Sequence, residues 1–168
     1  MRFLSSFFSL VVLFCYTSCG HKEGEFIADK HPSGSVKKVI EFKGDSTHLV
    51  REVEFFEVGD TSRVAHYEQD GKTLRSETIY YPNKEIKQSG QYNYGQRYGV
   101  WKAFFPSGQL QSIRNYNEAG KEEGLSNVYK LEGGYYYLFI SGYFSNGEKR
   151  GAWKFFNRNG DVIKAINN

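Results

Sequence analysis

An internal repeat of about 25 residues is the feature that most constrains how this 168-residue chain can fold. Aromatic pairs recur at nearly equal spacing, and a further aromatic residue lies 11 positions after the second member of each pair. The pairs are Phe55-Phe56, Tyr80-Tyr81 and Phe104-Phe105, and the residues that follow them are Tyr67, Tyr92 and Tyr116. A fixed period of this length is typical of a repeat array, in which each unit packs on its neighbours.

Glycines recur with the aromatic residues and mark the predicted turns. The glycines that we interpret as structural residues of the repeat are Gly95, Gly99, Gly108, Gly120, Gly124, Gly147, Gly151 and Gly160. The same four-residue turn is predicted at 31–34 (HPSG), 81–84 (YPNK), 105–108 (FPSG) and 157–160 (NRNG). Proline presets one turn dihedral, and glycine or asparagine accepts the positive φ that follows. Lys84 replaces glycine in the second of these turns.

Each repeat unit is expected to be a β-hairpin. Residues 101–105 (WKAFF) are strand-like, a Pro-Ser-Gly turn follows, and residues 109–117 (QLQSIRNYN) form the return strand. One such hairpin cannot bury its aromatic side chains alone. Residues 31–168 are therefore predicted to form an all-β domain, a single-layer antiparallel β-meander of repeated hairpins.

Two units resemble a known repeat. The segments 99–110 (GVWKAFFPSGQL) and 151–162 (GAWKFFNRNGDV) are similar to the MORN repeat in the variant found in many bacterial proteins. The resemblance is weaker at 76–92 and 124–131, which lack the tryptophan, and it is weakest at 31–67. It implies a single-layer sheet of hairpins that acts as a scaffold or binding module. Some bacterial relatives with this repeat carry an antitoxin label.

The first 18 residues have the three parts of a secretory signal. Arg2 precedes an uncharged apolar run at 3–14, which is too short to span a bilayer as a helix, and small residues follow. Thr17-Ser18-Cys19 resembles a bacterial lipobox, although Tyr16 stands where an aliphatic residue is usual. We therefore predict a helical lipoprotein signal peptide at 1–18, lipid attachment at Cys19 and a polar tether at 19–30. The alternative is an ordinary signal peptide with Cys19 incidental.

Composition agrees with an exported domain. Both cysteines lie at or before position 19, so the expected mature domain has no disulfide. The formal net charge is +3, or +2 once Arg2 leaves with the leader, and no basic stripe indicates a nucleic-acid partner. The predicted signal peptide and the lipid on Cys19 place the mature chain in the cell envelope, anchored to a membrane. Gly20 after the cysteine, rather than aspartate, favours the outer membrane over the inner membrane by analogy.

No residue pattern predicts catalysis, a metal or a cofactor. None of the four histidines lies at metal-ligand spacing to another, and no motif for a serine hydrolase, a zinc protease or a phosphate-binding loop is present. His31 occupies an aromatic position of the repeat, which favours a packed role. The chain is expected not to be an enzyme.

Exposed aromatic residues are the candidates for partner binding. They are Trp101, Phe104, Tyr135, Tyr136, Tyr137 and Trp153. A structural ladder of cross-strand pairs is the competing interpretation, and it is the stronger one for the two tryptophans. The three successive tyrosines interrupt the repeat and cannot all point to one face of a strand, which favours a contact role.

Three functions remain open from the sequence. The first is a lipid-anchored module that binds a protein in the envelope. The second is an antitoxin or immunity protein that neutralises a toxin, which depends on the resemblance alone. The third is a cell-surface carbohydrate binder, because aromatic side chains also form platforms for sugars.

Overall fold

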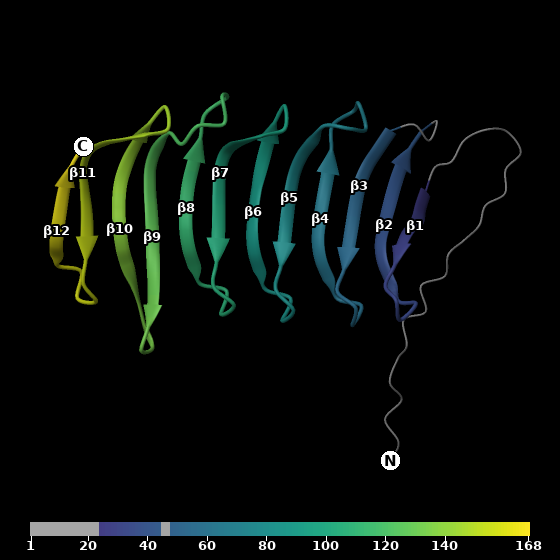
Figure 1. Ribbon diagram of the computed structural model, residues 1–168, viewed down its shortest axis with the longest axis horizontal. Helices are drawn as coiled ribbons and strands as arrows, with labels where there is room; N and C mark the ends of the chain where they lie inside the picture. Colours follow the sequence, from purple (N-terminus) through teal and green to yellow (C-terminus); the bar gives the residue numbers. More distant parts are fainter. Residues whose placement is uncertain (1–23, 45–47) are drawn as a thin grey trace, which may run out of the picture.

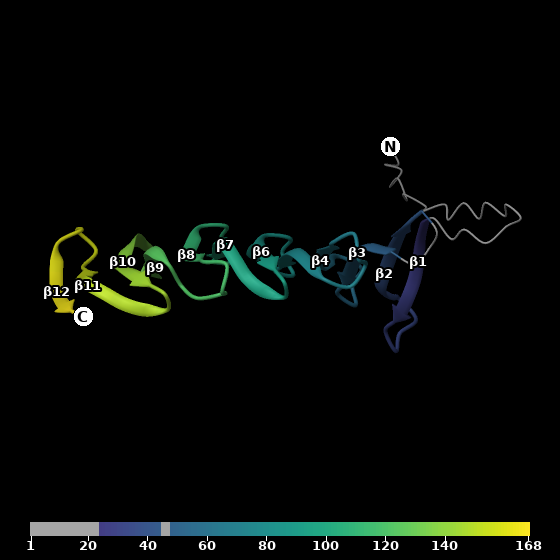
Figure 2. The same ribbon diagram turned by 90° about the horizontal axis from the view of Figure 1, so that it is seen from above.

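A single open β-sheet makes up the described part of the protein. The computed structural model describes residues 24–44 and 48–168, which form twelve antiparallel strands in sequence order (Figure 1). Seen along the perpendicular direction, the strands follow one another in one row along the long axis (Figure 2). The predicted all-β meander of hairpins is confirmed. The predicted signal helix, residues 1–18 and Cys19 lie outside the described residues.

The strands are short and similar in length. Their bounds are β1 Gly24–Lys30, β2 Val36–Lys43, β3 His48–Phe55, β4 Thr61–Tyr67, β5 Leu74–Tyr80, β6 Ile86–Asn93, β7 Gln96–Phe104, β8 Leu110–Tyr116, β9 Gly124–Glu132, β10 Tyr135–Ser145, β11 Glu148–Phe156 and β12 Val162–Asn167. Each strand pairs only with its neighbours in sequence, and β1 and β12 form the two ends of the sheet, so every connection between described strands is local.

One turn type recurs along one edge of the sheet. In the turn at 105–108, the Gly108 amide donates to the Phe105 carbonyl, and the Phe105 amide donates to the Gln109 carbonyl. The turns that begin at residues 31, 81 and 157 have the same pair of bonds, and so does a turn outside the four predicted, at 56. A further turn with these bonds, at 117, joins β8 to β9 and lies at the opposite edge. The fourth residue has positive φ, and Lys84 adopts it at 71° in place of glycine.

Positive φ is also the common property of the glycines singled out in the sequence. All eight have φ between 62° and 87°. Side chains other than glycine and asparagine rarely take this conformation. The aromatic period therefore marks the strands. Five of these glycines lie in the connections between strands, whereas Gly99, Gly124 and Gly151 lie within strands β7, β9 and β11.

Strand β1 corrects the predicted tether. The sequence predicts a polar tether at 19–30, but residues 24–30 pair with β2 along the whole strand. The Phe26 ring packs edge-on against Phe42, with ring centroids 6.1 Å apart. Polar residues at alternate positions are compatible with a strand whose other face is solvated, so composition alone could not separate strand from linker here.

The sheet has few buried side chains because it is one layer thick. Among the described residues, only Ala65, Trp101, Ser126, Gly142 and Trp153 are buried. Cross-strand contacts on each face must therefore supply most of the stabilisation that a hydrophobic core supplies in a two-layer domain.

Candidate functional site

The hairpin of β9 and β10 extends past its neighbours at one edge of the sheet (Figure 1). It ends in a two-residue turn at Gly133 and Gly134, whose φ angles are 58° and 82°. A two-residue turn with positive φ at both positions matches the right-handed twist of the two flanking strands. Tyr135, Tyr136 and Tyr137 follow this turn directly, so they lie at the tip of the longest strand.

Tyr136 points to one face of the hairpin. Its ring stacks on Tyr129, with centroids 5.4 Å apart and an interplanar angle of 13°. Its hydroxyl donates to the Leu110 carbonyl at 2.9 Å. Partial burial raises the pKa of Tyr136, and the neighbouring Tyr129 raises it further. The residue remains 38% exposed, so Tyr136 is held in place and still reachable.

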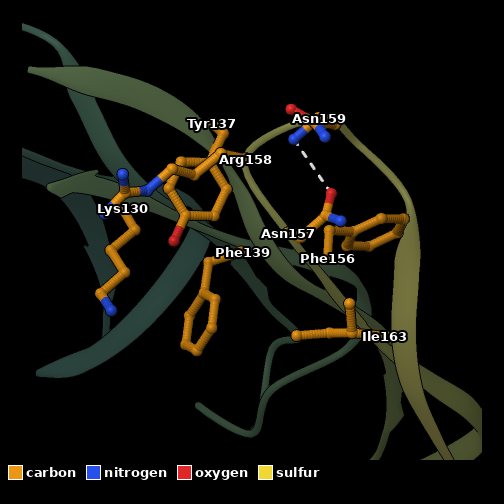
Figure 3. Close-up of a pocket in the computed structure, with 8 residues that line it drawn as sticks. All are labelled: Lys130, Tyr137, Phe139, Phe156, Asn157, Arg158, Asn159 and Ile163. Carbon is orange, nitrogen blue, oxygen red and sulfur yellow. Dashed lines mark hydrogen bonds between the residues drawn. The ribbon is translucent and has the colours of Figure 1, made fainter.

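Tyr137 points to the opposite face, where a hollow of about 480 Å³ opens. The residues that line the hollow are Lys130, Tyr137, Phe139, Phe156, Asn157, Arg158, Asn159 and Ile163 (Figure 3). They come from β9, β10, the end of β11, β12 and the turn between β11 and β12. Phe139 lies at a bulge in β10, and its ring makes edge contacts with Tyr137 at 6.5 Å and with Phe155 at 6.2 Å. The size lies within the range of about 300–1,000 Å³ that is common for ligand pockets.

Two cations and one carboxylate lie at the mouth of the hollow. The Glu132 carboxylate is 2.9 Å from the Lys130 ammonium and 3.7 Å from the Arg158 guanidinium. The Tyr137 hydroxyl donates to it at 3.4 Å. The hydrogen bond from Lys130 is the main cause that lowers the pKa of Glu132, and the reciprocal bond raises the pKa of Lys130.

Both cations also lie over aromatic rings. The Lys130 ammonium is 5.2 Å from the centroid of Phe139, and the Arg158 guanidinium is 5.2 Å from that of Tyr135. The Asn157 side-chain oxygen accepts hydrogen bonds from the amides of Asn159 and Asp161, each at 2.9 Å. These bonds close the turn that carries Arg158, so its position does not depend on the exposed ion pair alone.

Trp101 and Trp153 occupy two equivalent sites, 52 residues apart in the sequence. Each indole lies flat against a glycine of the preceding strand. A Cβ placed on Gly90 would lie 2.2 Å from the Trp101 ring, and one on Gly142 would lie 2.1 Å from the Trp153 ring. The indole N–H of Trp101 donates to a backbone carbonyl at 2.9 Å, and that of Trp153 does so at 3.2 Å.

Aromatic and cationic side chains cover both indoles. Tyr92 packs edge-on against Trp101 at 5.1 Å, and Phe144 does the same against Trp153 at 4.9 Å. The other contacts are Arg97 over Trp101 at 4.2 Å and Lys149 over Trp153 at 4.6 Å. The two tryptophans are 4% and 6% exposed, so a partner could reach little of either, and we leave both out of the contact surface.

Phe104 lies away from the hollow. It ends β7, is only partly exposed, and its carbonyl accepts a hydrogen bond from the Tyr81 hydroxyl at 3.0 Å. Of the six aromatic residues proposed from the sequence, the structure brings together only Tyr135, Tyr136 and Tyr137, which are successive. No sequence pattern indicates Lys130, Glu132 and Arg158 as site residues. Gly90 and Gly142 were not predicted either, although each glycine precedes a tryptophan by 11 residues.

A polar network takes the place of the aromatic packing in the first half of the sheet. The Arg63 guanidinium donates to Glu77 at 3.1 Å and to Glu52 at 2.7 Å. The Tyr92 hydroxyl donates to Glu77 at 2.6 Å. Ala65 pairs with Glu52 and Glu77 on the adjacent strands and is completely buried. Because cross-strand partners point to the same face, these side chains shield Ala65.

The stability of the sheet is expected to fall between about pH 10 and pH 12. Burial, and then the hydrogen bond to Glu77, raise the pKa of Tyr92 from 10.0 to about 12. A raised pKa stabilises the fold below the unfolded value, and that contribution is lost as the pH rises through the folded value. Solvent screening limits the loss to about 1 kcal/mol. Urea titrations of the native chain and of Tyr92→Phe should show a smaller loss over this range in the variant. Equal losses would show that Tyr92 does not cause the effect.

The described residues hold no recognisable metal site. Within residues 24–44 and 48–168, no three His, Cys, Asp or Glu side chains gather in a way that could bind a metal ion. His31 donates from its ring to the Phe55 carbonyl at 3.0 Å, which is consistent with a packed role. In the same ranges, no helix has the length and apolar character needed to span a membrane.

Comparisons with known proteins do not assign the chain to a family. No family model matches it, and no curated protein matches it significantly. By its fold, the described part is a single-sheet protein of repeated β-hairpins.

Proposed function

We propose that this chain is a non-catalytic protein-interaction module of the cell envelope, lipid-anchored through Cys19. The observation that carries the proposal is the tip of the β9–β10 hairpin, hereafter the tyrosine hairpin, which comprises residues 129–139. Tyr135 is 58% exposed and Tyr136 is 38% exposed, at the end of a hairpin that projects beyond the sheet (Figure 1). Clustered exposed aromatic residues are a common property of interaction surfaces.

The preorganised geometry of the tyrosine hairpin supports the same function. Tyr136 is held by stacking and by a hydrogen bond, and Arg158 is held over Tyr135 by the Asn157 turn. Side chains that are already fixed lose less conformational entropy when a partner binds. The MORN-like repeat contributes by analogy, since such repeats form scaffolds and binding modules, and we propose membership of that repeat class on the motifs at 99–110 and 151–162.

The anchor is tested by mass spectrometry and fractionation. A diacylated or triacylated Cys19 is expected at the N-terminus of the mature chain in the membrane fraction. The Cys19→Ala variant should appear in the soluble fraction, because it cannot carry the lipid. An unmodified N-terminus in the soluble fraction of the native strain would contradict the lipid anchor. It would also contradict the outer-membrane location, because that location depends on the anchor.

The contact surface is tested in the same cells by site-specific photo-crosslinking. A photoreactive amino acid in place of Tyr135 is expected to give a discrete protein adduct. Placed at Tyr94, it should give none. Tyr94 is a matched control because it is 90% exposed in a two-residue turn at the opposite edge of the sheet. Adducts of equal yield at both positions, or none at either, would count against the interaction module.

A carbohydrate ligand is the second candidate. It is favoured by the aromatic lining of the hollow together with the amides of Asn157 and Asn159. Retention on a cell-wall fraction that is abolished by Tyr137→Ala, with no protein adduct at Tyr135, would support it in place of the first proposal. The antitoxin alternative depends on the MORN resemblance alone, and a toxin encoded beside this gene would be the observation in its favour.

A further inference from the structure

Charge at the hollow is unbalanced in favour of cations. Lys130 and Arg158 share the single carboxylate of Glu132, which is the only acidic side chain in ion-pair contact with either of them among the described residues. A third cation, Lys164, lies 5.8 Å from the ring centroid of Phe155, which itself contacts Phe139. Asp161 is the nearby acid of the turn, and its carboxylate accepts a hydrogen bond from the Asn157 amide at 3.0 Å.

Half of the residues that line the hollow are aromatic or aliphatic. Tyr137, Phe139, Phe156 and Ile163 supply the aromatic and aliphatic surface, and Ile163 is 62% exposed. An exposed aliphatic side chain beside two cations fits a ligand that combines an apolar group with a negative charge. The hollow of about 480 Å³ can hold one large side chain and its neighbours.

Glu132 has the position of an internal competitor. Its carboxylate already makes the contacts that an incoming acid would make, with the Lys130 ammonium at 2.9 Å and the Tyr137 hydroxyl at 3.4 Å. Both cations are about half exposed, with side-chain accessibilities of 42% for Lys130 and 47% for Arg158. Ion pairs of this exposure are weak, so exchanging one carboxylate for another costs little.

We propose that the hollow binds an acidic peptide segment of a partner protein, with an aspartate or glutamate beside a large apolar residue. The apolar side chain enters between Phe139 and Ile163, while the carboxylate displaces Glu132 from Lys130 and Arg158. A peptide is favoured over a simple anion because most of the lining offers no charge. The inference rests on the proposed function and names the chemistry of the partner segment.

The test uses the full-length chain purified in detergent and two fluorescent peptides. The first is Glu-Phe-Glu-Leu with blocked ends, and the second is its Gln-Phe-Gln-Leu counterpart. Fluorescence anisotropy is expected to show binding of the acidic peptide only. Arg158→Gln should weaken binding by about threefold to tenfold, because a charged hydrogen-bond partner is removed. Glu132→Gln should instead tighten binding by about threefold, because the competing carboxylate is gone.

The control variant is Arg150→Gln. Arg150 forms the same kind of exposed pair, with Glu148 at 2.7 Å, but it does not line the hollow. Unchanged affinity is expected for this variant, with circular dichroism confirming that all three variants fold. Equal binding of the two peptides, or weaker binding in Glu132→Gln, would overturn the inference. Glucuronate that displaces the acidic peptide at concentrations where acetate does not would assign the hollow to an acidic sugar instead. A Tyr135 adduct in cells together with equal binding of the two peptides would support the interaction module and overturn the acidic-peptide ligand.

Discussion

Replacement of Trp101 by alanine is expected to lower the free energy of unfolding by about 3–5 kcal/mol, the range for deleting a buried aromatic side chain. The indole covers Gly90, contacts Tyr92 and carries the Arg97 guanidinium on its face. Its loss would expose all of these at once and remove the hydrogen bond to the Gln91 carbonyl. Chemical denaturation followed by far-ultraviolet circular dichroism measures the effect without relying on tryptophan fluorescence.

Val100 provides the matched control for this experiment. It precedes Trp101 on β7 and is 47% exposed, so Val100→Ala should cost less than about 1 kcal/mol. Hydrogen exchange adds a spatial test, since repeat proteins can unfold locally. Trp101→Ala should lower amide protection most in β6, β7 and β8, and Trp153→Ala should do so in β10, β11 and β12. A loss below about 1 kcal/mol for both tryptophan variants would contradict the structural role of the two indoles.

Adding a single methyl group at Gly90 is expected to destabilise the sheet by about 2–3 kcal/mol, at the upper end of the range for overpacking. The new Cβ would lie 2.2 Å from the Trp101 ring, and a fused ring system cannot yield as the far end of a flexible side chain would. Gly142→Ala should behave alike, since its Cβ would lie 2.1 Å from Trp153. Thermal and urea unfolding of each variant measures the change.

A double-mutant cycle separates this clash from the general effect of losing a glycine. If the Trp101 ring is the obstacle, Gly90→Ala should cost much less in a Trp101→Leu background than in the native chain, because residues in contact are not additive. Ser89→Ala, one position away on the same strand, serves as the control and should change stability by less than about 1 kcal/mol. Additive costs in the cycle would show that the glycine is needed for another reason.

Two glycine–tryptophan contacts show how a one-layer sheet is stabilised without a second layer. They are formed by Gly90 with Trp101 and by Gly142 with Trp153. At two places, 52 residues apart in the sequence, a flat indole fills the space above a glycine. The indole is buried there, although no second layer packs on the sheet. In the first half of the sheet, the Arg63 network performs the same task over Ala65 with charged groups. The aromatic residues thus have two roles. Trp101 and Trp153 stabilise the sheet, whereas the tyrosines of the tyrosine hairpin are exposed.

The class of fold and most of the turns can be predicted from the amino-acid sequence alone. The recurrence of aromatic residues at intervals near 25 and the turn motifs at 31–34, 105–108 and 157–160 predicted hairpins that the structure contains. Turn chemistry and strand alternation are local properties, so they can be read from short stretches of chain. Even the substitution of Lys84 for glycine did not alter its turn, because the surrounding hairpin holds the positive φ of 71°.

Which residues face one another depends on how the strands pair in three dimensions. Bulges shift the register between β6 and β7 and between β10 and β11, and these shifts bring Trp101 over Gly90 and Trp153 over Gly142. The hollow likewise joins Lys130 to Arg158, which the sequence separates by 28 positions. A displacement of one residue in register moves every side chain of a strand to the opposite face, so these contacts depend on pairing between strands and not on any local pattern.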